Sequence, residues 1–101
     1  MERQDFITAL ENNFKDCIEI VKKKNSDYAK DVDPFKNFRL SEFVGLCSLE
    51  RAILVRMMDK IQRVVNLLDK EASVKDESIE DTLKDLINYA NILLVYLKSR
   101  K

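Results

Sequence analysis

Apolar residues recur at spacings of three and four along three stretches of the chain, and this period predicts amphipathic helices. The first helix is expected over residues 4–24, the second over residues 49–70, and the third from residue 76 or 79 to residue 97. Ser48 directly precedes the second stretch, and its hydroxyl is expected to cap that helix. Each helix should bury one apolar face.

Residues 25–40 show neither helical nor strand periodicity, and only a short helix over residues 41–46, ending near Gly45, is expected after them. A loop of this length is uncommon in a compact domain, and it is usually either functional or disordered. Disordered segments rarely carry aromatic residues such as Tyr28, Phe35 and Phe38. We therefore expect an ordered loop that has a function.

Together these elements predict an all-α fold. It would be a small helical bundle of three main helices plus a short helix, with the long ordered loop between the first and second. The 101 residues are expected to form a single domain. Apolar residues make up 46% and charged residues 36% of the chain, which is typical of a globular protein.

Composition excludes several functions. The formal net charge is zero, so non-specific nucleic-acid binding is not expected, and no apolar run approaches the ~18 residues of a membrane span. The start, MERQDF, is unlike a signal peptide. Cys17 and Cys47 lie in apolar patterns, so both are expected to be reduced core residues. Together these features predict a cytoplasmic protein. The absence of histidine excludes Cys-His and Ser-His-Asp catalysis, and a single glycine excludes phosphate-binding glycine loops. Any metal would therefore bind to carboxylates, as magnesium, manganese and calcium do.

Acidic and amide side chains follow one line of the third predicted helix, at spacings of four, four and three: Glu77, Asp81, Asp85 and Asn88. Carboxylates one turn apart converge and can share a divalent cation, although an ordinary solvated stripe is the alternative. The line continues into residues 92–97, which are apolar all round, so either the loop or a second subunit must cover them. We therefore expect a homo-oligomer with Tyr89 and Tyr96 at or beside the contact.

A second polar line follows the middle predicted helix and contains Arg56, Asp59, Arg63 and Asn66, with Lys60 at its edge. Two arginines and a lysine around one carboxylate suit a phosphate group bridged by a metal. The alternative is an ordinary ion pair between Asp59 and Arg63 on a solvated face.

The segment DPFKNFR, residues 33–39, has a functional and a structural interpretation. In the functional interpretation, an aromatic ring stacks on a base, Asn37 contacts the edge of the base, and Arg39 binds a charged group of the ligand. In the structural one, the aspartates form turns while Phe35 and Phe38 plug the end of the bundle. The pattern alone does not decide between them.

Four motifs occur in a fixed order: KNSDY at 24–28, DPFKNFR at 33–39, RMMDKIQR at 56–63 and DESIEDTLKDLINYA at 76–90. Over about residues 20–97 the chain resembles the nucleotide modification associated domain 1 family, which consists of small phage and prophage proteins. The resemblance implies a role in phage nucleotide metabolism. The patterns and the resemblance together indicate these nucleotide-binding residues: Asn25, Asp27, Tyr28, Phe35, Asn37, Phe38, Arg39, Arg56, Lys60, Arg63 and Asn88.

More remotely, the segment EDTLKD at residues 80–85 is similar to the acidic helix of the all-α nucleoside triphosphate pyrophosphatases of the MazG and dimeric dUTPase type. Those enzymes hold magnesium against a triphosphate with helix-borne carboxylates. The paired ExxE that they carry on a preceding helix is missing here. The likeness implies magnesium as the cofactor, with these candidate ligands: Asp59, Glu77, Glu80, Asp81 and Asp85.

Three functions stay open. The leading one is a phage-type nucleotide-binding protein, most simply a magnesium-dependent nucleotide pyrophosphatase or related hydrolase. The alternative is a non-catalytic binder that sequesters a nucleotide signal of the host's antiphage defence, in the host cytoplasm. The third is a small structural or interaction module.

Overall fold

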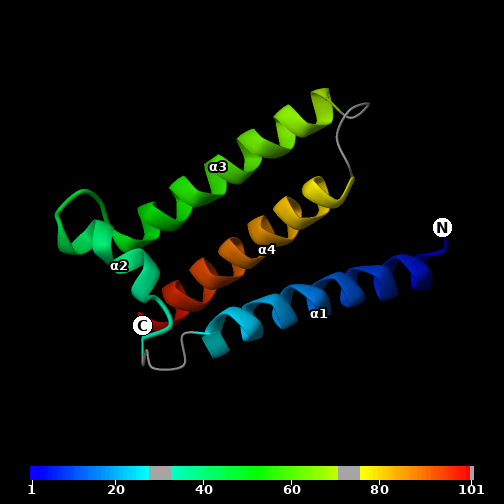
Figure 1. Cartoon of the computed structure of the whole chain (residues 1–101). Helices are drawn as coiled ribbons and strands as arrows, with labels where there is room; N and C mark the ends of the chain where they lie inside the picture. Colours follow the sequence, from blue (N-terminus) through cyan, green and yellow to red (C-terminus); the bar gives the residue numbers. More distant parts are fainter. Residues whose placement is uncertain (28–32, 71–75, 101) are drawn as a thin grey trace. The chain divides into compact units, whose positions relative to one another are not determined.

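The computed structural model describes residues 1–27, 33–70 and 76–100, without the side chains of residues 25–27 and 76–78. The described chain is almost wholly helical and holds no strand, which confirms the all-α prediction. Its elements are α1 (Arg3–Asp27), α2 (Lys36–Phe43), α3 (Leu49–Asp69) and α4 (Asp76–Ser99), as Figure 1 shows. The chain divides into two units, Met1–Val32 and Asp33–Lys101, and the expected single domain stays a prediction.

The helix α1 forms the first unit and extends further than its apolar period predicts. It continues to Asp27, three residues beyond the predicted end, so the start of the expected loop is helical. Lys24 lies in its last turn, where a positive charge interacts favourably with the negative end of the helix dipole. Periodicity missed this turn because it adds no apolar residue to the apolar face of the helix.

The helix α2 begins at Lys36, five residues before the predicted start, so much of the expected loop is helical too. Asp33 opens it, because its Oδ1 accepts a hydrogen bond from the Phe35 backbone N–H at 3.0 Å. Sequence periodicity missed this helix because its apolar residues do not share one buried face. Leu40 is 67% exposed and Phe43 is 88% exposed.

The connection from α2 to α3 follows the predicted signals. Gly45 has a φ of 79°, and the N–H of Leu46 bonds to the carbonyl of Ser41 at 2.9 Å, which together make a Schellman ending. Ser48 caps α3 as predicted, because its Oγ accepts from the Arg51 N–H at 3.3 Å. The chain therefore turns sharply between the two helices.

The helices α3 and α4 lie side by side and run antiparallel (Figure 1). Leu49 and Ile53 of α3 are fully buried. Two ion pairs join the helices: Arg100 Nη1 lies 2.5 Å from Glu50 Oε2, and Lys60 Nζ lies 3.1 Å from Asp85 Oδ2. These contacts set the register of the hairpin, which is the scaffold of the second unit.

Two expectations from composition are tested by the described residues. Both cysteines are free thiols, but only Cys17 is a core residue, because Cys47 is half-buried. Within the described ranges, no helix is both long and apolar enough to cross a membrane.

Candidate functional site

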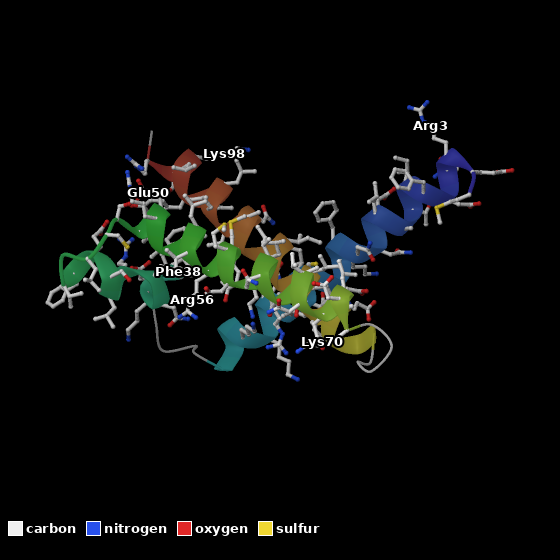
Figure 2. The ribbon with its side chains drawn as sticks, turned by 90° about the horizontal axis from the view of Figure 1, so that it is seen from above. Arg3, Phe38, Glu50, Arg56, Lys70 and Lys98 are labelled. Atoms are coloured by element: carbon white, nitrogen blue, oxygen red, sulfur yellow. The ribbon has the colours of Figure 1, made fainter. Side chains whose placement is uncertain are left out.

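A hollow of about 460 Å³ lies along one side of α3. Its lining is mostly polar and consists of Arg56, Asp59, Lys60, Gln62, Arg63, Asn66, Leu67 and Lys70. The structure therefore gathers every member of the polar line that the sequence predicts on this helix. Figure 2 shows Arg56 and Lys70 on one side of α3 and Glu50 on the opposite side.

Helical spacing explains this lining. Arg56, Arg63 and Lys70 follow one another at intervals of seven residues, which is two turns of an α-helix, so they project from the same side. Sequence reasoning missed Lys70 because it stands at the predicted helix end, although the interval of seven was a usable signal. It also missed Gln62, for which the polar line gave no signal.

Positive charge dominates the hollow, because it is lined by two arginines and two lysines but by only one carboxylate, Asp59. Across the described ranges, neither Arg56 nor Arg63 has an ion-pair partner. Each guanidinium thus keeps its planar set of N–H donors available for an oxyanion. The arrangement suits a ligand that carries several negative charges.

Lys60 and Asp85 connect the two polar lines that the sequence predicts on separate helices. Their charged atoms lie 3.1 Å apart, and the side chains are only 27% and 26% exposed. Removing one partner of such a half-buried pair leaves the other charge poorly solvated. Asp85 is therefore a structural partner of α3, in addition to any role in ligand binding.

The acidic line on α4 is divided between exposed and covered positions. Glu80 and Asp81 are exposed, Asp85 pairs with Lys60, and Asn88 is only 7% exposed. The Glu77 side chain lies outside the described residues. Among the side chains that are described, no three acidic or cysteine groups gather closely enough to hold a metal ion. The proposed magnesium ligand set therefore stays a prediction.

The segment DPFKNFR is ordered by its own charges. Arg39 Nε donates a short hydrogen bond to Asp33 Oδ2, and Arg39 Nη1 lies 3.9 Å from Glu42 Oε1. The hydrogen bonds from Arg39 and from the Phe35 N–H hold the pKa of Asp33 below its usual value, and the same pair raises the pKa of Arg39. Asp33 is thus the turn former of the structural interpretation, and Arg39 already contacts two carboxylates.

Both phenylalanines of this segment pack edge to face against tyrosines of α4. The ring centroids of Phe35 and Tyr96 are 5.1 Å apart, and those of Phe38 and Tyr89 are 6.0 Å apart. Such pairs contribute about 0.5–1.5 kcal/mol beyond the area that they bury. The segment therefore covers part of the all-round apolar end of α4, for which the sequence left the choice between the loop and a second subunit.

Acidification should weaken the Asp33 contacts. Because the folded-state pKa of Asp33 is lowered, its contribution to stability is present above the unfolded-state pKa and is lost as the pH falls through the folded value. We expect Asp33→Asn to lower the melting temperature at pH 7, and this difference from the wild type should vanish in strong acid. Thermal melts by circular dichroism check this, with Glu11→Gln in α1 as the control. A difference that is constant with pH would contradict it.

The remaining predicted residues belong to the motif KNSDY. Asn25 and Asp27 lie in the last turn of α1, but their side chains are outside the described part of the structure, as is Tyr28 altogether. Their predicted role in nucleotide binding stays a prediction.

Comparison with known proteins places the chain in a family. No curated protein and no solved structure matches it. The family model described as nucleotide modification associated domain 1 matches residues 24–97, which include the polar lines of α3 and α4 and the segment DPFKNFR. These residues make up most of the chain, so the resemblance seen in the four motifs is confirmed. The chain therefore belongs to the nucleotide modification associated domain 1 family.

Proposed function

We propose that this protein binds a nucleotide and holds its phosphate groups in the hollow of α3. The observation that carries the proposal is the gathering of Arg56, Lys60, Arg63 and Lys70 around one hollow of about 460 Å³. The family description, which links the domain to nucleotide modification, supports the same class of ligand. A cationic hollow of this kind attracts phosphate more strongly than it attracts a neutral ligand.

Each lining residue has a distinct part in this proposal. Arg56 and Arg63 would each donate two parallel hydrogen bonds to phosphate oxygens, which a guanidinium does better than an ammonium group. Lys60 would share its charge between Asp85 and the ligand. The amides of Gln62 and Asn66 would donate to or accept from the remaining polar atoms of the nucleotide.

The segment DPFKNFR is the proposed contact for the base. Phe38 packs on Tyr89, which follows Asp85 by one turn of α4, and Asp85 is the ion-pair partner of Lys60 in the lining of the hollow. Asn37 is exposed, so its side-chain amide can form hydrogen bonds with the edge of a base. In this arrangement Arg39 orders the segment through Asp33, and binding of a phosphate by Arg39 would require it to exchange that partner.

The proposal takes two forms, binding alone and binding followed by hydrolysis. Hydrolysis would require carboxylates that hold magnesium, and the proposed set remains Asp59, Glu77, Glu80, Asp81 and Asp85. Magnesium would offset phosphate charge and activate a water molecule. Asp81→Asn is the clean test of this set, because Asp81 is exposed and, unlike Asp85, is not part of the ion pair with Lys60.

A panel of nucleotides, measured with and without magnesium, tests the proposal. Calorimetry should show binding of at least one nucleoside di- or triphosphate, and binding should weaken as salt is raised, because charges carry it. Turnover that requires magnesium and is lost in Asp81→Asn would establish the enzyme. Tight binding without turnover would establish sequestration. If no nucleotide binds, the proposal is wrong and the structural module is the remaining function.

A further inference from the structure

Asp59 is the single carboxylate in the lining of the hollow, which otherwise carries positive charge. Arg56 precedes it by three residues and Arg63 follows it by four, and these are spacings at which side chains of a helix form ion pairs. Within the residues that the structure describes, Asp59 nevertheless has no ion-pair partner, and it is exposed. Both of its carboxylate oxygens are therefore available to a ligand.

Other polar side chains of the hollow already have partners within the fold. Lys60 Nζ lies 3.1 Å from Asp85 Oδ2, and the side-chain amide of Gln62 donates a hydrogen bond to Asn66 Oδ1 at 3.4 Å. In the described part of the chain, the charged groups of the lining that have no partner are its two arginines and, between them along α3, Asp59. A ligand of this hollow thus meets two guanidinium groups and one carboxylate.

The phosphates of a bound nucleotide do not explain a carboxylate at this position, because like charges repel. The partners that remain for Asp59 are a cation and a hydrogen-bond donor of the ligand. The two arginines and two lysines of the lining disfavour a further cation, whether it is a magnesium ion or an amino group. A hydroxyl group is neutral and meets no such repulsion, and its hydrogen bond to a carboxylate is stronger than one between neutral groups.

The sugar is the part of a nucleotide that supplies hydroxyl groups beside the phosphates. In a ribonucleotide the 2′ and 3′ hydroxyls are adjacent, so both can donate to the two oxygens of one carboxylate. An acidic side chain binds the ribose in this way at the dinucleotide sites of another fold. A 2′-deoxyribonucleotide has only one of the two hydroxyls, so a carboxylate at this position distinguishes the two sugars.

We propose that Asp59 accepts hydrogen bonds from the ribose hydroxyls of the bound nucleotide, while Arg56 and Arg63 hold its phosphates. Asp59 is then the residue that makes the hollow specific for ribonucleotides over deoxyribonucleotides. This inference rests on the proposed function, because it names the class of nucleotide that the same hollow takes. The hydrolytic form of that proposal then depends on the carboxylates of α4 alone.

Calorimetry with the common ribonucleoside triphosphates and their 2′-deoxy counterparts, in a buffer that contains EDTA, tests the inference. The ribonucleotide that binds most tightly should bind about tenfold more tightly than its 2′-deoxy form, which is the effect of one hydrogen bond to a charged acceptor. Asp59→Ala should bring this ratio close to one. The same variant should bind inorganic triphosphate at least as tightly as the wild type does, because the removed carboxylate repels phosphate.

Asp69→Ala is the matched control, because Asp69 is an exposed carboxylate at the end of the same helix but outside the lining of the hollow. It removes the same charge and should leave the preference for ribose unchanged. Equal affinity for both sugars, a preference that survives in Asp59→Ala, or one that requires magnesium would overturn the inference and leave the proposed function standing. If neither the nucleotides nor inorganic triphosphate bind, the proposed function fails together with the inference.

Discussion

Replacing Arg56 and Arg63 together with alanine is expected to weaken nucleotide binding by at least about 100-fold. Each guanidinium would lose charge-assisted hydrogen bonds worth about 1.5–3 kcal/mol, and both side chains are exposed, so the lower end of that range applies. Two losses of about 1.5 kcal/mol amount to a factor of about 100. Because neither arginine forms an ion pair among the described residues, the melting temperature should hardly change.

A matched control removes two positive charges elsewhere. Arg3 and Lys15 are exposed residues of α1, and the double variant Arg3→Ala/Lys15→Ala lowers the net charge by the same amount. Calorimetry should find its affinity within about threefold of the wild-type value. Equal losses in both double variants would mean that net charge attracts the nucleotide and that the hollow has no special role.

Phe38→Ala is expected to cost about 2–3 kcal/mol of unfolding free energy. The ring is half-buried and packs against Tyr89 at a centroid distance of 6.0 Å and an interplanar angle of 81°, so the variant loses both burial and the aromatic pair. Fully buried Phe→Ala changes cost about 3–5 kcal/mol, and partial exposure reduces this. Urea unfolding followed by circular dichroism gives the value.

Phe43→Ala is the control, because that ring belongs to the same helix but is 88% exposed. Its replacement should change the unfolding free energy by less than about 0.5 kcal/mol. Nucleotide affinity measured on folded Phe38→Ala then separates the two interpretations of DPFKNFR. Unchanged affinity per folded molecule would make the segment a structural plug, and a parallel loss of affinity would place the base beside it.

The sequence predicts α3 and α4 well because their apolar periods are long and their ends carry ordinary signals. Ser48 and Gly45 act as expected, and α3 ends one residue before its predicted limit. The helix α2 was missed over Lys36–Leu40 because Leu40 and Phe43 point to solvent and leave no apolar period to detect. Hydrogen bonds from the Phe35 N–H and from Arg39 to the Asp33 carboxylate hold the start of that helix, and composition does not reveal them.

The candidate site likewise combines contacts that the sequence predicts with contacts that it does not reveal. Spacing on one helix predicts that Arg56, Asp59 and Arg63 share a side, and the structure gathers them. The pairing of Lys60 with Asp85 joins two helices, and it depends on their register, which spacing within either helix does not contain. For the same reason spacing did not reveal that Arg39 contacts Asp33 and Glu42.

Backbone amide chemical shifts, measured by nuclear magnetic resonance during titration with the tightest-binding nucleotide of the panel, test the central claim most directly. If the phosphates occupy the hollow, the largest changes should cluster on one side of α3 between Arg56 and Lys70, with smaller changes around Asp85. Inorganic triphosphate should shift the same α3 amides and leave those of residues 33–39 nearly unchanged. Saturable nucleotide binding that leaves the amides between Arg56 and Lys70 unperturbed would contradict the account.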